Sequence, residues 1–315
     1  MKLVSIPANP APEGVVTAML KTPDGVSLRY ARWSPPPGRK GTVCVFPGRT
    51  EFIEKYFEVV RDLRARGFAV AILDWRGQGL SDRLTADTRK SHIHDFAQYD
   101  LDLETFVKEI VLPDCPPPLF ALGHSAGATV LIRAAAKGRR WFDRMVLSAP
   151  MIRPAPEQTM RFARPMVRAM RLAGLGSRYV PGGSGAVLAL DPFFGNLTTS
   201  DPVRHARTAA VVEAEPTLGI ASPTVAWANA ALRAMKEIDN SIYPSRIRQP
   251  ILIAAAGRDQ LVSTPAIEEF GIHLRAGSHL MIAGAQHELL MEQDRYRGQF
   301  WAAFDAFVPG SPLFG

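Results

Sequence analysis

The stretch GHSAG at residues 123–127 constrains the fold of this chain more than any other feature of its sequence. It follows the apolar run 119–122 and precedes a helix-forming stretch. A strand, a tight turn that carries a serine and a helix form a nucleophile elbow when the turn reads Gly-x-Ser-x-Gly. The turn is strained, and small flanking residues let the strand and the helix pass close together. The sequence predicts an exposed Ser125 hydroxyl with Gly123 and Gly127 as elbow glycines; taken alone, the pattern also fits a helix start capped by the serine.

Strands alternate with helices along most of the chain, which predicts a mostly parallel, doubly wound α/β sheet. An antiparallel hairpin that turns at Asp24-Gly25 opens it. The run 68–73 is apolar throughout, as expected for a strand buried on both faces. The expected strands are residues 16–21, 26–31, 42–46, 68–73, 119–122, 144–148, 250–255 and 278–283, and the expected helices are residues 51–66, 95–111, 126–137, 264–274 and 294–307.

The segment 151–243 interrupts this alternation after the sixth strand. Its pattern is helical, with many proline and glycine breaks. We expect residues 1–150 and 244–315 to form one core domain and residues 151–243 to form a helical lid inserted into it. Ligands of open α/β sheets bind at the carboxyl ends of the strands, so a lid placed there would cover the elbow.

The net charge of +7 is compatible with nucleic acid, an anionic membrane surface or neither. The sequence has no zinc-finger spacing, RNP pattern or lysine tract, which argues against nucleic acid as a partner. Two cysteines, Cys44 and Cys115, make no disulfide framework and favour a reducing compartment. There is no apolar run of about 18 residues, and the N-terminus is a poor signal peptide. We therefore expect a cytoplasmic protein.

A serine hydroxyl becomes a nucleophile at neutral pH only beside a base, and that base needs a carboxylate to orient it. In an elbow fold the chain order is serine, acid, histidine, with the last two in loops that follow core strands. Asp259 comes just after the strand 250–255, and His287 just after the strand 278–283. We therefore predict a triad of Ser125, Asp259 and His287.

The remaining acidic and imidazole candidates fit less well. Asp74 ends a strand before the serine, and its loop favours a turn-forming role. His124 lies inside the elbow, where its side chain is expected to point away from the nucleophile. The other histidines are interpreted as surface or packing residues: His92, His94, His205, His273 and His279.

Acyl transfer also needs two N–H donors for the oxyanion. One is expected from Ala126, the residue after the nucleophile, and one from the loop that follows the strand 42–46. Pro47 has no N–H, so we assign Arg49, with Gly48 permitting close approach of the backbone. The same residues would also build an ordinary strand-to-helix turn.

With these motifs the chain resembles the α/β-hydrolase superfamily and, more narrowly, its bacterial lysophospholipase and monoacylglycerol lipase group. The resemblance is carried by FPGRTE at residues 46–51 with Tyr56, DWRGQGLS at 74–81, GHSAG at 123–127, GRD at 257–259, GAQHE at 284–288, and lid segments 197–201 and 223–227. It implies ester hydrolysis of single-chain lipids without a metal or an organic cofactor. Many relatives have His-Gly where this chain has Pro47-Gly48, which is closer to the lysophospholipase branch. The choice between lysophospholipid and monoacylglycerol stays open.

The predicted function is a serine hydrolase that cleaves lipid-like carboxylic esters through an acyl-enzyme. One alternative is an acyltransferase or perhydrolase on the same scaffold, since a fold alone does not fix the chemistry. Another is a lipid-binding protein without catalysis. Dehalogenase and epoxide hydrolase chemistry is disfavoured because it needs a carboxylate in place of Ser125.

The lid also contains a basic, amphipathic stretch. Its arginines are spaced three and four residues apart on one helical face, and its apolar residues lie on another. They are Arg161, Arg164, Arg168 and Arg171, and Phe162, Met166, Met170 and Ala173. Arg161 belongs to this face only if the helix begins before it; the alternative is that Pro165 starts the helix and leaves Arg161 outside. The helix either packs its apolar face on the core or docks on a membrane surface; the sequence does not fix the oligomeric state.

Overall fold

The computed structural model describes residues 3–35 and 40–308, and for residues 157–162 it describes the backbone alone. Its centre is an eight-stranded sheet in the order β1-β2-β4-β3-β5-β6-β7-β8. The strands are β1 Val15–Lys21, β2 Ser27–Trp33, β3 Thr42–Phe46, β4 Ala69–Leu73, β5 Leu119–His124, β6 Arg144–Ser148, β7 Ile251–Ala256 and β8 Gly277–Ile282. β2 pairs antiparallel with both β1 and β4, and all other pairs are parallel. The predicted mostly parallel α/β sheet is confirmed.

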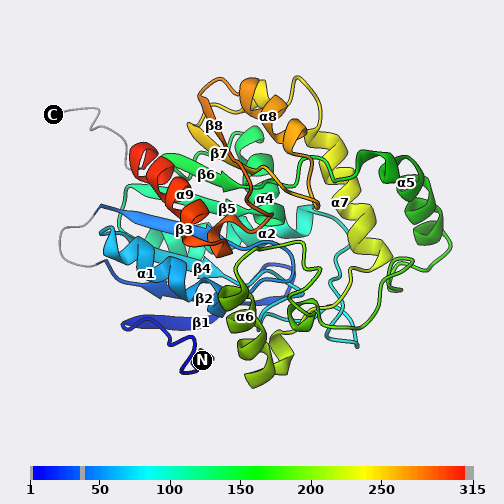
Figure 1. Ribbon diagram of the computed structural model, residues 1–315, viewed down its shortest axis with the longest axis horizontal. Helices are drawn as coiled ribbons and strands as arrows, with labels where there is room; N and C mark the ends of the chain where they lie inside the picture. The colour runs from blue at the N-terminus through cyan, green and yellow to red at the C-terminus, as the bar shows by residue number, and fades with distance from the viewer. Residues whose placement is uncertain (1–2, 36–39, 309–315) are drawn as a thin grey trace.

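Helices cover both faces of the sheet (Figure 1). The helices of the core are α1 Phe57–Ala65, α2 Ala97–Phe106, α3 Leu112–Asp114, α4 Ser125–Ala136, α8 Thr264–Ile272 and α9 Asp294–Phe307. Two of the expected helices are interrupted. The one expected over 51–66 begins with the 3-10 turn η1 Ile53–Tyr56, and α2 continues as the π-helical turn η2 Val107–Val111.

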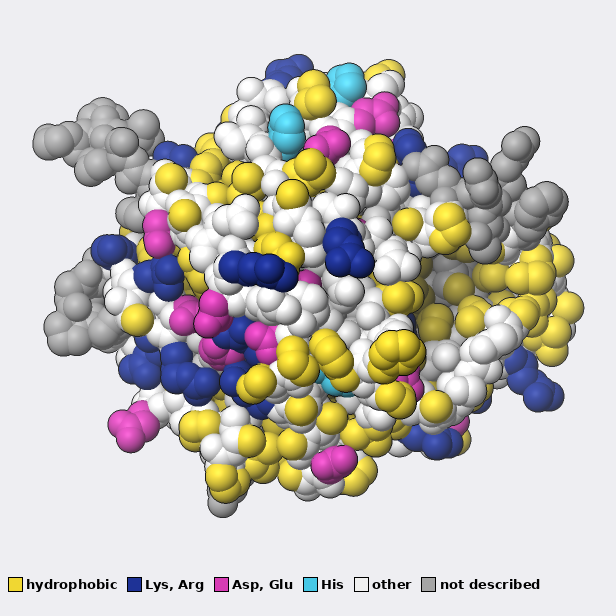
Figure 2. All heavy atoms as spheres, in the orientation of Figure 1, with side chains coloured by type: hydrophobic (Ala, Val, Ile, Leu, Met, Phe, Trp, Pro, Cys, Tyr) yellow, Lys and Arg dark blue, Asp and Glu magenta, His cyan; other side chains and the backbone are white. Residues whose placement is uncertain are grey.

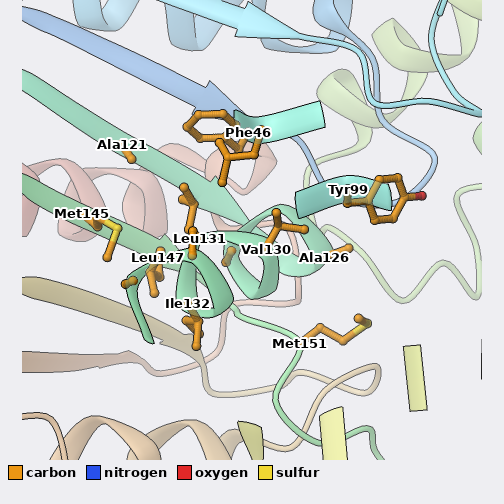
Figure 3. Close-up of a cluster of buried hydrophobic side chains, with 14 of the residues drawn as sticks. Phe46, Tyr99, Ala121, Ala126, Val130, Leu131, Ile132, Met145, Leu147 and Met151 are labelled. Carbon is orange, nitrogen blue, oxygen red and sulfur yellow. The ribbon is translucent and has the colours of Figure 1, made fainter. Parts of the chain in front are cut away.

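The apolar residues form one large cluster on each face of the sheet. Along β3, Cys44 and Phe46 belong to the cluster that also contains residues of α2, α4 and α8, whereas Val43 and Val45 belong to the cluster with α1 and α9. This alternation follows from the two-residue period of a strand. Figure 3 shows Phe46 with Leu131 from α4 in the first cluster. Burial on both faces thus fixes the strand ends that carry the candidate site.

The segment 151–243, which lies between β6 and β7, is helical, as the sequence suggested. It contains the helices α5 Glu157–Leu172, α6 Pro202–Ala214 and α7 Val225–Ile238, and the 3-10 turns η3 Leu188–Leu190 and η4 Pro216–Leu218. Two further 3-10 turns lie outside it: η5 Pro244–Arg246 directly follows it, and η6 Leu289–Met291 lies near the C-terminus. Arg49 Nη1 donates to the Ala221 carbonyl at 3.3 Å, and the Glu288 amide donates to the Thr198 carbonyl at 2.7 Å. The segment therefore contacts the loops that follow β3 and β8.

Pro165 does not start the lid helix. α5 begins at Glu157 and runs through Pro165, so the backbone of Arg161 lies inside the helix. A proline within a helix removes one hydrogen bond and strains the preceding turn. Packing of α5 against α7 offsets that local cost. The side chains of Arg161 and Phe162 lie outside the described residues.

Candidate active site

The backbone at Ser125 has the strained geometry of a nucleophile elbow. Ser125 joins β5 to α4 with φ = 49°, in the left-handed region that side chains other than glycine rarely adopt. A Cβ at Gly127 would lie 2.5 Å from the Pro47 carbonyl oxygen and still closer to that of Phe46. A Cβ at Gly123 would lie 2.7 Å from Leu131 Cδ1. Both glycines therefore permit α4 to pass against β5 and against the loop that follows β3.

The three side chains predicted as a triad meet in one hydrogen-bonded chain. His287 Nε2 lies 3.0 Å from Ser125 Oγ, and His287 Nδ1 lies 2.7 Å from Asp259 Oδ2. Asp259 Oδ1 accepts the amides of Leu261 at 2.8 Å and Val262 at 3.0 Å. Both oxygens of the Asp259 carboxylate are thereby used, and its orientation toward the imidazole is fixed.

The environment keeps Asp259 ionised. Burial by itself would raise the pKa of Asp259. The hydrogen bond and charge of His287, together with the amides of Val262 and Leu261, outweigh burial and lower that pKa below its usual value. A charged carboxylate at Nδ1 leaves Nε2 as the imidazole nitrogen available to the serine.

The loops that carry Asp259 and His287 hold each other in place. The Gly257 amide donates to the Ile282 carbonyl at 3.0 Å, and the Arg258 amide donates to the Ala285 carbonyl at 2.9 Å. β7 and β8 are parallel neighbours, so their carboxyl ends lie at one edge of the sheet. Topology thus brings together side chains that are far apart in sequence.

The two backbone amides assigned to the oxyanion belong to segments that adjoin Ser125. Ala126 is in the first turn of α4, where helix N–H groups have no intrahelical acceptor. On the other side, a Cβ at Gly48 would lie 3.2 Å from Ser125 Cβ, so this loop abuts the serine. The Gly48 amide donates to Glu51 Oε2. Within the described parts of the chain, the amides of Arg49 and Ala126 have no acceptor.

Two side chains hold the loop that contains Arg49. Trp75 Nε1 donates to the Pro47 carbonyl at 2.8 Å, and Gln78 Nε2 donates to the Gly48 carbonyl at 2.7 Å. Both come from the turn after β4. Asp74 in that turn accepts the Leu80 amide, which fits the predicted turn-forming role, but it is also fully buried against Arg29.

Sequence reasoning missed a buried polar cluster beside the predicted triad. His124 is buried, and its ring centroid lies 4.8 Å from that of His287. Burial is the main cause that lowers the pKa of His124, so its imidazole is neutral near pH 7. Glu51, Lys55 and Glu288 lie next to this pair. In the sequence, Glu51 lies close to Gly48, and Glu288 directly follows His287. This proximity to candidate site residues was the signal that could have revealed the cluster.

The other candidate histidines make contacts elsewhere. His92 Nδ1 lies 2.9 Å from Thr224 Oγ1, and the ring of His205 meets that of Phe193 edge to face. His273 Nδ1 lies 2.7 Å from the carbonyl of Glu269, one turn earlier in the chain. Across residues 3–35 and 40–308 there is no group of three His, Cys, Asp or Glu side chains that could hold a metal ion.

The fold and this arrangement define an α/β-hydrolase with a serine at its elbow. The family model described as serine aminopeptidase, S33, matches residues 37–294, and the chain belongs to this family. Lysophospholipase L2 of Escherichia coli K12 is 29% identical to it over 284 residues, which cover 87% of this chain and 82% of that protein. The monoglyceride lipase of Mus musculus is 30% identical over 136 residues, which cover 42% of this chain and 43% of that protein.

Solved structures show the same fold at low sequence identity. A soluble variant of monoglyceride lipase from Saccharomyces cerevisiae, in complex with a substrate analog, aligns with a TM-score of 0.71 at 20% identity, covering 93% of this chain and 95% of that one. A thermostable carboxyl esterase from Bacillus coagulans aligns with a TM-score of 0.75 at 17% identity, covering 94% and 98%. In the described part of the protein, none of the helices is both long and apolar enough to cross a bilayer.

Proposed function

We propose that the protein hydrolyses carboxylic esters of single-chain lipids through an acyl-enzyme on Ser125. The protein is a carboxylic ester hydrolase, and relatives named lysophospholipase and monoglyceride lipase support lipids as its substrates. The observation that carries the proposed mechanism is the continuous hydrogen-bonded chain from Ser125 Oγ through His287 to Asp259.

The geometry suits each step of this reaction. His287 Nε2 takes the proton of Ser125 as the hydroxyl attacks the ester carbonyl. The amides of Arg49 and Ala126 stabilise the oxyanion that forms. His287 then gives its proton to the leaving alcohol and activates the water that releases the fatty acid. Asp259 stabilises the imidazolium in both steps.

The side chain of Arg49 favours an anionic headgroup, and hence a lysophospholipid over a monoacylglycerol. Its guanidinium stacks over Trp227 at 5.4 Å from the ring centroid. Among the described residues it has no carboxylate partner, and Ala221 supplies only one carbonyl, at 3.3 Å. Burial lowers the pKa of Arg49 to about 10, so the group remains charged near pH 7. A phosphodiester offers such a cation the opposite charge, whereas glycerol does not.

The test compares two substrates that share one acyl chain, lysophosphatidylcholine and monoacylglycerol. In Arg49→Gln, we expect the ratio of their kcat/KM values to fall about tenfold or more, as for loss of a hydrogen bond to a charged group. Arg83 is a matched control because it too donates to the segment 151–243, at the Thr217 carbonyl. An unchanged ratio in Arg49→Gln would refute the headgroup assignment.

We further propose that residues 151–243 act as a lid and that α5 rests on a lipid surface. Met166 and Leu172 on α5 and Leu175 just after it are exposed, Leu172 by 80%. Arg164 and Arg168 are exposed on the same helix. Figure 2 shows apolar side chains gathered at the edge where Figure 1 places α5, with basic side chains nearby. Basic and apolar side chains together are typical of helices that lie in a membrane interface.

The decisive experiment for the proposed function is hydrolysis by the Ser125→Ala variant. We expect the variant to keep its fold, measured by circular dichroism, and to lose nearly all turnover of p-nitrophenyl esters and of lysophospholipids. Wild-type rates in a correctly folded Ser125→Ala protein would refute the assignment of the nucleophile.

A further inference from the structure

Lys55 lies buried between the two loops that carry the proposed oxyanion donor and the proposed base. Its Nζ is 3.0 Å from Glu51 Oε1 and 2.7 Å from Glu288 Oε1. The side chains of Lys55, Glu51 and Glu288 are 7%, 3% and 13% exposed. A single ammonium group thus joins carboxylates that are distant in the sequence.

Each carboxylate belongs to a loop of the site. Glu51 Oε2 accepts the Gly48 amide and, at 2.6 Å, the Tyr56 hydroxyl. It therefore holds the peptide that immediately precedes the Arg49 amide. Glu288 directly follows His287 in the chain, so its position is coupled to that of the imidazole.

The charges of this cluster fit a fixed arrangement. Burial by itself would raise the pKa of Glu51, but the charge of Lys55, followed by weaker contributions from other neighbours, lowers it to about 2. Burial by itself would lower the pKa of Lys55, but the charges of Glu288 and Glu51 outweigh burial and raise that pKa above its usual value. Glu51 and Lys55 are therefore both ionised at neutral pH. Removing one partner would leave a buried charge without compensation, so the three positions are interdependent.

The location of the cluster separates it from an ordinary structural ion pair. Buried ion pairs contribute little net stability compared with apolar replacements, and their best-attested use is to fix registry. Here the groups whose registry is fixed are an oxyanion amide and a general base, whose relative position controls the rate of acyl transfer.

We propose that Lys55 is a positioning residue, which clamps the loop after β3 to the loop after β8 and so sets the Arg49 amide and His287 in register. This inference rests on the proposed function. It assigns Lys55 no contact with the substrate. Its effect passes through Glu51 on one side and Glu288 on the other.

The test replaces Lys55 by methionine and by arginine and measures kcat, KM and the affinity for an alkyl trifluoromethyl ketone. This inhibitor forms a tetrahedral adduct that needs both the base and the oxyanion amides. In Lys55→Met we expect kcat to fall about tenfold or more, inhibitor affinity to fall by a similar factor, and KM to change far less. Lys55→Arg keeps the charge, and we expect it to recover part of the loss.

Arg133→Met is the matched control. The Arg133 side chain is also 7% exposed and joins two carboxylates, those of Asp100 and Glu237, but on α2 and α7. We expect this variant to lose stability with kcat within about twofold of wild type. An equal loss of kcat in Arg133→Met and Lys55→Met would overturn the proposal, since general destabilisation would then explain both.

A second variant keeps the inference testable if Lys55→Met does not fold. Glu288→Gln breaks one arm of the clamp and leaves the pair of Lys55 and Glu51 intact, and we expect kcat to fall in the same way. A folded Glu288→Gln protein with wild-type kcat and inhibitor affinity would overturn the clamp. Absence of ester hydrolysis in the wild-type protein would instead refute the proposed function.

Discussion

One methyl group at Gly127 tests how closely α4 must approach the loop after β3, which carries the proposed oxyanion donor Arg49. An alanine Cβ there would lie 2.5 Å from the Pro47 carbonyl oxygen, and ordinary contacts begin at 3.4 Å. The obstructing atoms are backbone, so α4 and the loop must separate by about 1 Å rather than rotate a side chain. That separation moves Ser125 away from the Arg49 amide. A misplacement of about 1 Å costs roughly 100-fold in rate.

The assay pairs kinetics with stability. We expect Gly127→Ala to lower kcat/KM for p-nitrophenyl butyrate about 100-fold, and to lower the free energy of unfolding in urea by about 1–3 kcal/mol, as for overpacking. Gly298→Ala is the control, because its Cβ would meet no atom within 4 Å in α9. That variant should gain about 0.5–1 kcal/mol and keep wild-type kinetics.

Two results would refute this reasoning. A folded Gly127→Ala protein with at least half of the wild-type kcat/KM would show that the close approach is not needed for catalysis. An equal loss of activity in Gly298→Ala would show that the assay reports a general response to added methyl groups.

Three further predictions follow from the site, the partly buried carboxylate of Glu58 and the proposed lid. Asp259→Asn should lower kcat by about 10³- to 10⁴-fold while the protein stays folded, as in other triads that lose their acid; steady-state kinetics decides this, and a near-normal kcat would contradict the role of Asp259. Burial would raise the pKa of Glu58, but hydrogen bonds and charges from Arg204 and Arg297 outweigh burial and lower that pKa to about 2. The ionised Glu58 therefore stabilises the folded state above the usual carboxyl pKa, and this stabilisation is lost as the pH falls toward 2. Between pH 6 and pH 2 the wild type should therefore lose about 2–3 kcal/mol more of its unfolding free energy than Glu58→Gln, and equal losses in urea titrations would argue against it. Leu172→Ser should weaken binding to anionic vesicles about tenfold in a sedimentation assay. Unchanged binding would exclude this face of α5 as the surface that contacts lipid.

The strands and the elbow could be predicted because local patterns determine them. Continuous apolar runs mark buried strands, and the glycines around Ser125 mark a turn that few other residues can make. The partners of Ser125 could be placed as well, since parallel strands bring their carboxyl ends to one edge and Asp259 and His287 each follow such a strand. The structure brings these three side chains together.

Features that depend on tertiary contacts could not be predicted. α5 passes through Pro165 because packing against α7 outweighs the local preference to begin a helix there. The buried position of His124 depends on the neighbouring Ser148 and His287. The partners of Lys55 lie on separate loops, and no spacing in the sequence relates Lys55 to Glu288.

The most direct test of the proposed mechanism is covalent labelling by a fluorophosphonate, followed by peptide mass mapping. If Ser125 is the nucleophile activated by His287, one adduct forms on the peptide that contains Ser125, disappears in Ser125→Ala and forms far more slowly in His287→Ala. An adduct on another serine, or labelling that persists unchanged in Ser125→Ala, would contradict the mechanism proposed for this protein.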